Sequence, residues 1–209
     1  MILVGQYDSP FVRRVAISLR VLGFSYEHDT RSVFGDFEAM RTINPLGRIP
    51  ALILPSGETL IDSTAILDWL DETVGPERAL LPHASAERRR ALRLIALATG
   101  TQDKIGAVGF ERTMRPAPYR WPAWIDRCRI QGSGGLAALD AEAWPPDAPL
   151  DQAQITTACV FRWAQLGAPD LVPPGRYPRL DALSARLEAR PEFQATNPGE
   201  WRVPSGGNS

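Results

Sequence analysis

The chain has little of what holds small secreted domains together or binds metal ions. Cys128 and Cys159 are its only cysteines, and His28 and His83 are its only histidines. Two cysteines cannot build a disulfide framework, and no Cys-x-x-Cys pair is present for zinc or redox chemistry. The sequence therefore predicts no metal site. With 209 residues, the chain can bury about 70% of its unfolded surface and fold around a hydrophobic core alone.

Long apolar runs and an excess of one charge sign are also missing. No apolar run approaches the roughly 18 residues that a membrane-spanning helix needs. The opening Met1–Gly5 stretch is too short for a secretory signal and lacks its basic lead. Lysine and arginine number 23 and aspartate and glutamate 24, a formal net charge of −1, which argues against nucleic-acid and anionic membrane partners. We expect a cytoplasmic protein with neither kind of partner.

Residues 1–76 alternate strand and helix signals. Residues 2–4 are a short apolar run, and Ser9-Pro10 places an N-cap and a first-turn proline before apolar residues at helical spacing. A second strand is expected over 24–28 and a short helix over 34–42. Such a strand, helix and strand predict a parallel pair with a right-handed crossover.

A hairpin and one more helix complete this first region. The apolar runs 51–54 and 58–61 flank a Pro-Ser-Gly turn. Asp62 or Ser63 then caps a helix that ends at Gly75. The predicted order is βαβαββα, an α/β domain over residues 1–76.

The remainder carries only helical patterns. Long helical segments are expected over 85–112 and 119–143, although three glycines weaken the middle of the second. A capping-box pattern at 151–154 starts another helix, and 179–188 forms the last. We predict an all-helical domain over residues 85–200, followed by a disordered tail at 204–209.

Three short motifs could carry chemistry, each with a purely structural alternative. A hydroxyl at the first turn of a helix, such as Ser9, can stabilise a thiolate in the helix's N-terminal field, or simply cap the helix. Pro50 at a strand start can be cis, turning the backbone of Ile49 outward to pair with an extended ligand, or it can be an ordinary trans proline. Asp62 and Ser63 can hold the ammonium and carboxylate of an amino acid, or only cap a helix.

The order and spacing of these motifs, within βαβαββα followed by helices, resemble the soluble glutathione transferase superfamily. The likeness is greatest to bacterial serine-type members that open with Ser-Pro-Phe-Val-Arg. It implies a thioredoxin-like domain that binds glutathione as co-substrate, without a metal, and a helical domain that supplies most of the second-substrate pocket. It further implies a homodimer. Cysteine-type members carry a cysteine where Ser9 stands, so thiol–disulfide reductase chemistry is not expected.

The resemblance assigns roles to individual residues. Ser9 matches the residue that contacts the glutathione sulfur, and Ile49 and Pro50 match the backbone partner of the cysteinyl unit and its cis proline. Asp62 and Ser63 match the pair that binds the γ-glutamyl end, and Arg48 stands where a side chain can reach the glycyl carboxylate. The second-substrate pocket is expected to include these side chains: Tyr7, Phe11, Asp103 and Phe110.

These assignments predict an enzyme in which Ser9 stabilises the glutathione thiolate for attack on a small apolar electrophile. Tyr7, near the end of the first strand, is the competing partner of the sulfur. Two alternatives use the same fold without catalysis: a glutathione-binding regulatory protein and a ligand carrier.

Overall fold

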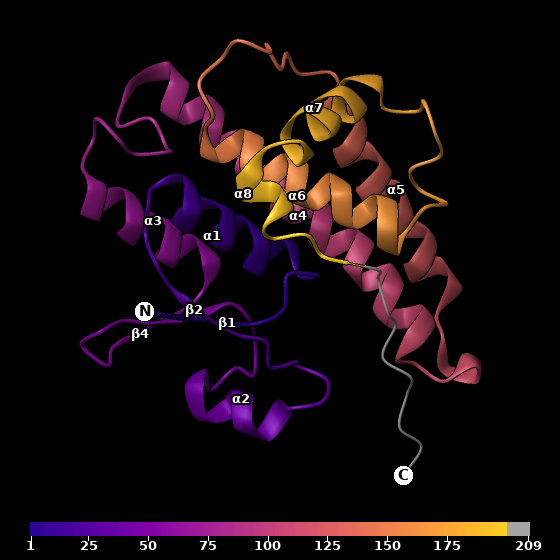
Figure 1. Ribbon diagram of the computed structural model, residues 1–209. Coiled ribbons are helices and arrows are strands. Elements are labelled where there is room, and N and C mark those ends of the chain that lie inside the picture. Colours follow the sequence, from indigo (N-terminus) through magenta and orange to yellow (C-terminus); the bar gives the residue numbers. More distant parts are fainter. Residues whose placement is uncertain (200–209) are drawn as a thin grey trace.

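Residues 1–74 fold around a four-stranded mixed sheet in a computed structural model that describes residues 1–199 (Figure 1). The strands and helices follow in this order: β1 (Ile2–Val4), α1 (Pro10–Val21), β2 (Glu27–Asp29), α2 (Phe37–Ile43), β3 (Ala51–Ile53), β4 (Thr59–Leu60) and α3 (Ser63–Val74). This is the predicted βαβαββα order of a thioredoxin-like domain.

The sheet has the strand order β2-β1-β3-β4. β1 pairs in parallel with β2, and the antiparallel pairs β1–β3 and β3–β4 place Leu3 opposite Leu52 and Leu52 opposite Leu60. The parallel pair needs a crossover connection, and α1 provides it. The strands are short, so burial of both faces must stabilise them.

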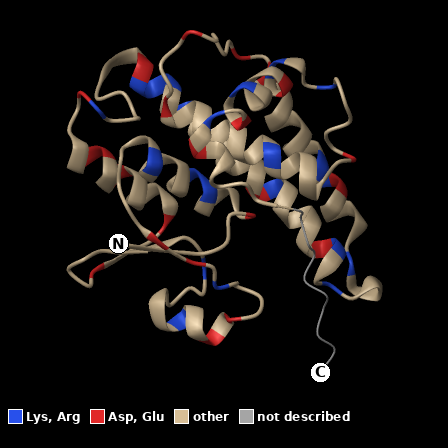
Figure 2. Cartoon of the chain, viewed as in Figure 1, with Lys and Arg blue, Asp and Glu red and all other residues tan. Residues whose placement is uncertain are grey.

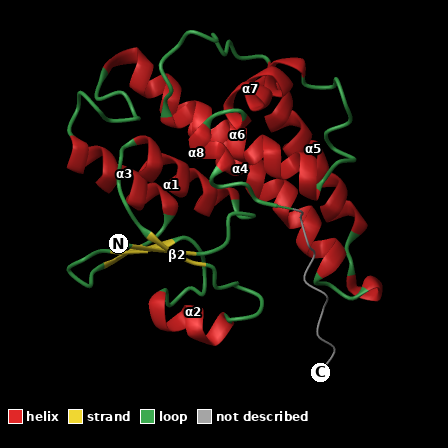
Figure 3. Ribbon diagram, in the orientation of Figure 1, coloured by secondary structure: helices red, strands yellow, loops and turns green. Residues whose placement is uncertain are grey.

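Helices cover the sheet on both faces. α1 and α3 lie on one face and α2 on the other (Figures 1 and 3). On the α2 side, Met40 packs with Val4 and Ala51 in a small separate cluster of fully buried side chains. Successive side chains of β1 point to opposite faces of the sheet, so Leu3 faces the main core while Val4 faces this small cluster.

The rest of the described chain is helical. It comprises α4 (Ser85–Thr113), the 3₁₀ turn η1 (Ala117–Tyr119), α5 (Pro122–Asp140), α6 (Gln152–Gly167), α7 (Pro178–Glu188) and α8 (Pro191–Gln194). The Asp151 carboxylate accepts a hydrogen bond of 2.8 Å from the Gln154 amide and caps α6. The predicted capping box therefore works through Asp151.

Two of the three glycines that weaken the pattern of α5, Gly132 and Gly135, lie against α4. A methyl group added at Gly132 would meet the Ile105 side chain at 2.8 Å, and one at Gly135 would collide with Thr101. Small residues here let the two helix backbones approach closely, which the sequence shows only as low helix propensity.

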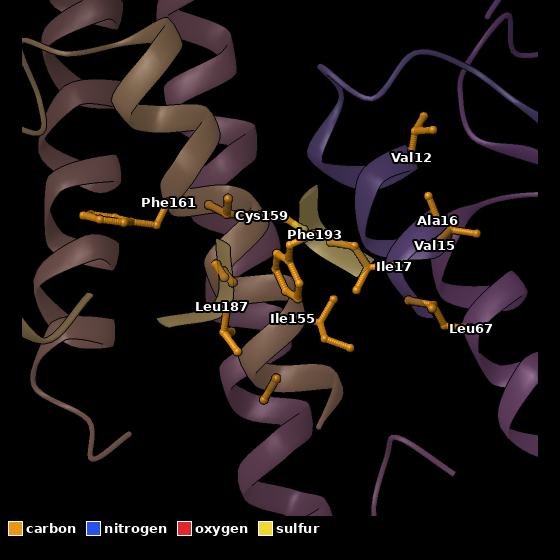
Figure 4. Close-up of a cluster of buried hydrophobic side chains, with 14 of the residues drawn as sticks. Val12, Val15, Ala16, Ile17, Leu67, Ile155, Cys159, Phe161, Leu187 and Phe193 are labelled. Atoms are coloured by element: carbon orange, nitrogen blue, oxygen red, sulfur yellow. The ribbon is translucent and has the colours of Figure 1, made fainter. Parts of the chain in front are cut away.

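One hydrophobic core continues from the sheet domain into the helical domain. Ile17 of α1 lies beside Ile155 of α6 and Phe193 of α8 (Figure 4). The division into domains at 1–76 and 85–200 stays a prediction, and the expected tail at 204–209 lies outside the described residues. Residues 1–199 contain no helix long and apolar enough to cross a membrane. Along the described chain, positive and negative residues are interspersed (Figure 2).

Candidate functional site

Two adjoining cavities lie where the sheet domain meets α4. Their volumes are about 410 and 590 Å³. Four residues line both cavities: Phe11, Arg48, Ile49 and Asp103. These residues come from the start of α1, the turn before β3 and the middle of α4, so neither domain forms the site by itself.

The turn before β3 is held in a defined shape. The Asn44 side-chain amide donates to the Arg48 carbonyl at 2.8 Å, and the backbone at Gly47 has a φ of 59°, which favours glycine. The Ile49–Pro50 peptide bond is cis, so the prediction made for Pro50 is confirmed. Ile49 and Pro50 both line the 410 Å³ cavity.

Asp62 and Ser63 stand at the start of α3 and line the same cavity. The Asp62 carboxylate accepts from the Thr64 amide at 2.7 Å, so it caps the helix; the Ile61–Asp62 peptide bond is cis. Ser63 is only 2% exposed, and its hydroxyl oxygen accepts from two guanidinium nitrogens of Arg14, at 2.7 and 3.2 Å. Asp62 therefore caps α3 and still lines the smaller cavity together with Ser63.

Ser9 lines the 590 Å³ cavity. Its hydroxyl oxygen accepts from the Val12 amide at 3.4 Å, so it is the N-cap of α1. Accepting this bond uses one lone pair and leaves the hydroxyl proton free to donate. Asp8 lines the same cavity, and burial raises the pKa of its carboxyl above the usual range.

The wall of the larger cavity is mainly apolar and aromatic. Its aromatic side chains are Phe11, Phe34, Phe37, Phe110 and Trp163. Phe34, from the loop before α2, and Phe110, from α4, approach with ring centroids 6.1 Å apart. Of the pocket residues predicted from the sequence, this cavity includes Phe11, Asp103 and Phe110.

Tyr7 lines neither cavity, against the expectation that it borders the second-substrate pocket. Its hydroxyl pairs with the Tyr26 hydroxyl at 2.8 Å, and its ring stacks on His28 with centroids 3.9 Å apart. Burial and the bond to Tyr26 raise the pKa of Tyr7 far above its ordinary value. A phenol held this way stays protonated at neutral pH and is directed at Tyr26.

Sequence reasoning missed three residues that line the cavities. Arg14 lines the smaller cavity, and Phe34 and Trp163 line the larger one. The doubled arginine after Ser-Pro-Phe-Val was the available signal for Arg14, because an arginine within the buried stripe of a helix needs a partner. Nothing in the local pattern marks Phe34 or Trp163, since only the tertiary fold brings them to the cavity.

The cysteines of the chain are unsuited to covalent catalysis. Both are buried, and burial raises the pKa of Cys159 to about 12, which keeps it a thiol at neutral pH. Among residues 1–199 no cluster of three or more metal-binding side chains occurs. Neither cysteine lines either of the two cavities.

Comparison with known proteins assigns this architecture to a family. Residues 3–78 match the family described as glutathione S-transferase, N-terminal domain. The chain is 30% identical to the uncharacterized GST-like protein YibF of Escherichia coli, with 95% of this chain and 98% of that protein covered. It is 27% identical to a probable maleylacetoacetate isomerase 1 of Drosophila melanogaster, over 94% of this chain and 81% of that one.

A solved structure agrees over nearly the same length. A glutathione transferase family member from Pseudomonas fluorescens, crystallised with bound glutathione, superposes with a TM-score of 0.83 at 34% identity, covering 93% of this chain and 97% of that one. Full-length similarity, the matching N-terminal domain and the shared fold together lead to one conclusion: the chain belongs to the glutathione transferase superfamily.

Proposed function

We propose that this protein is a glutathione transferase that ionises the glutathione thiol and presents it to a small apolar electrophile. The observation that carries the proposal is the pair of adjoining cavities, one lined by Ile49, Pro50, Asp62 and Ser63 and the other lined in part by Ser9. The Pseudomonas fluorescens relative was crystallised with bound glutathione, which supports the same ligand here.

The smaller cavity offers a partner for each part of the tripeptide. The Asp62 carboxylate can bind the γ-glutamyl ammonium, and the Ser63 hydroxyl can bind the γ-glutamyl carboxylate. The backbone of Ile49 can pair with the cysteinyl unit as an added strand does, and Arg48 can reach the glycyl carboxylate. The cysteinyl sulfur would then lie toward Ser9 and the larger cavity, because Ile49 lines both.

The chemistry proposed for the chain is stabilisation of a thiolate. The Ser9 hydroxyl donates to the sulfur at the N-terminus of α1, where the helix field also favours negative charge. The aromatic wall desolvates an apolar substrate beside it, and the two reactants are held together. The sulfur then forms a bond to an electrophilic carbon, and the leaving group departs with its electron pair.

A conjugation assay with an activated chloroarene and glutathione tests this function. We expect saturable, enzyme-dependent release of chloride and formation of the thioether. Glutathione binding without turnover of any electrophile would favour a regulatory binding protein instead, and binding of apolar dyes without glutathione would favour a carrier. Isomerisation through the same thiolate is the second candidate, because one full-length relative is named a probable maleylacetoacetate isomerase.

Replacing Asp62 with asparagine should weaken glutathione binding by about 10-fold or more, since a hydrogen bond to a charged group is lost or weakened. Asparagine caps helices as well as aspartate does, so the melting temperature should hardly change. Asp62→Ala is the matched control that loses the cap as well. Titration calorimetry and thermal melts separate the roles: unchanged affinity in Asp62→Asn would leave Asp62 only its capping role.

We also propose a homodimer. Leu92 on α4 and Ile130 on α5 are 44% and 73% exposed, so apolar side chains remain on the surface of these helices. Light scattering at micromolar concentrations should give twice the chain mass of 23.0 kDa. A single-chain mass across that range would contradict the proposal.

A further inference from the structure

Gln102 is a buried amide whose oxygen lacks a hydrogen-bond partner. It lies in the middle of α4 and is 6% exposed. Its side-chain oxygen, Oε1, is buried and accepts no hydrogen bond within residues 1–199. An amide oxygen can accept two hydrogen bonds, and leaving it buried without one is costly. A buried acceptor of this kind points to a donor that arrives with a ligand.

Two glycines of the same helix leave open space in the cavity that Gln102 lines. Gly106 and Gly109 line the 590 Å³ cavity together with Gln102, and the smaller cavity includes none of the three. Apart from the backbone of α4 and the adjoining residues, a methyl group added at Gly106 would meet only the Gln102 Nε2 atom, at 3.9 Å, and one at Gly109 would meet nothing within 4 Å. Glycine lowers helix stability relative to alanine, and no neighbour packs against these two. The space gives a ligand room to approach the Gln102 amide.

The charged side chains that line this cavity balance. Asp8 and Asp103 oppose Arg48 and Arg112, and Arg112 also contacts Asp170 at 3.4 Å. A lining with no formal net charge and an aromatic wall favours a neutral ligand, because a charged one would lose its hydration without a compensating partner. The donor for the Gln102 oxygen is therefore a hydroxyl or an amide N–H rather than an ammonium.

We propose that Gln102 is a specificity-determining residue that selects a neutral electrophile whose apolar body carries a hydroxyl or an amide N–H. This inference rests on the proposed function and narrows its substrate class. The glutathione thiolate forms a bond to the electrophilic carbon, and the leaving group departs with its electron pair. The hydroxyl or N–H keeps its proton and donates a hydrogen bond to the Gln102 Oε1. An analogue of the same shape without a donor leaves that oxygen unpaired, so the site rejects it.

A matched pair of benzylic chlorides tests the inference, each in 3- and 4-substituted form and with saturating glutathione. One carries a hydroxymethyl group and the other an ethyl group of nearly the same shape. Dividing kcat/KM by the uncatalysed rate constant with glutathione removes differences in intrinsic reactivity. The parent protein should prefer the hydroxymethyl compound by about 10-fold in at least one series. The methoxymethyl compound, which can accept but not donate, should gain no such preference over the ethyl compound.

Two variants of α4 locate the cause of the preference. Gln102→Leu should reduce it to within about 2-fold, while glutathione affinity stays at the parent value because Gln102 does not line the smaller cavity. Its melting temperature should not fall, since an unpaired buried acceptor is removed. Gly106→Ala should raise the melting temperature and lower kcat/KM for the hydroxymethyl compound, because the added methyl group fills space beside the amide.

A matched control is available one residue away. Thr101 is 3% exposed, its hydroxyl donates to the Leu97 carbonyl at 2.7 Å, and it lines neither cavity, so Thr101→Val should keep the parent's preference. Equal rates with the hydroxymethyl and ethyl compounds in the parent, or a preference that survives in Gln102→Leu, would overturn the role of Gln102 while leaving the proposed function intact. A parent that conjugates neither these chlorides nor an activated chloroarene would overturn both. If Gln102→Leu does not fold, Gly106→Ala decides, because an unchanged kcat/KM for the hydroxymethyl compound would overturn the inference.

Discussion

Replacing Ser9 with alanine should slow glutathione conjugation by about 10- to 100-fold while glutathione affinity falls much less. A hydrogen bond to a charged sulfur is worth about 1.5–3 kcal/mol, and it forms only with the ionised thiol. In the proposed binding mode, Ile49, Asp62 and Ser63 hold the rest of the tripeptide in the smaller cavity, whose lining does not include Ser9. The loss should therefore appear in turnover.

The pH dependence identifies the cause of this loss. Without the Ser9 hydroxyl, the pKa of the bound glutathione thiol rises, so the pH–rate profile should shift to alkaline pH and activity should partly recover there. The N-terminus of α1 remains and still favours the thiolate, so the shift is partial. Ultraviolet absorbance of the bound thiolate against pH measures the titration directly.

Two variants serve as controls for Ser9. Ser9→Thr keeps both the hydroxyl and a good N-cap, and should retain most of the activity. Ser9→Cys should introduce mixed-disulfide chemistry that the parent lacks. Identical thiolate titrations and equal turnover in parent and Ser9→Ala would show that Ser9 only caps α1.

Replacing Arg13 with methionine should lower the free energy of unfolding by about 3 kcal/mol or more, because breaking a buried ion pair leaves its partner uncompensated. The Arg13 guanidinium binds both oxygens of Glu188 and also donates to the carbonyls of Phe193 and Thr196, at 3.1 and 2.9 Å. It therefore connects α1 of the sheet domain to α7 and the segment around α8.

Urea denaturation of the full chain measures this effect, and a double-mutant cycle with Glu188→Gln apportions it. Each single substitution should lower the free energy of unfolding. The double variant should lose less of this free energy than the sum of the two single losses. The Glu188 side chain is 25% exposed, so water can partly solvate its carboxylate once Arg13 is removed. The loss of unfolding free energy should therefore lie near about 3 kcal/mol rather than well above it. A change below about 0.5 kcal/mol in Arg13→Met, the range typical of surface substitutions, would contradict the prediction.

Local chemistry made much of the fold predictable from the sequence. The order of strands and helices follows from apolar spacing and from caps that act within a few residues: Ser9-Pro10 starts α1, Asp62 starts α3 and Asp151 starts α6. The position of Pro50 at a strand start left both cis and trans open, and the resemblance to the glutathione transferase superfamily favoured the cis bond that is present. Ser9, Ile49, Asp62 and Ser63 were selected by the same resemblance, because each short segment alone also fits a purely structural role.

The side-chain contacts between the sheet domain and the helical domain were not predictable from local patterns. Arg14 has a buried place because Ser63 and Thr156, 49 and 142 residues away along the chain, meet it in three dimensions. Tyr7 follows the first strand just as a sulfur-contacting tyrosine does, yet stacking on His28 and the bond to Tyr26 direct its hydroxyl away from the cavities.

The sequence by itself therefore determined the strands and helices and the caps that start α1, α3 and α6. Those features depend on interactions between near neighbours, which a sequence displays directly. Only the tertiary structure decided which side chains line the apolar cavity, why Gly132 and Gly135 are small, and which buried cation lines the smaller cavity. These features depend on contacts between distant segments, and close packing between α4 and α5, or across the two domains, has no local signature.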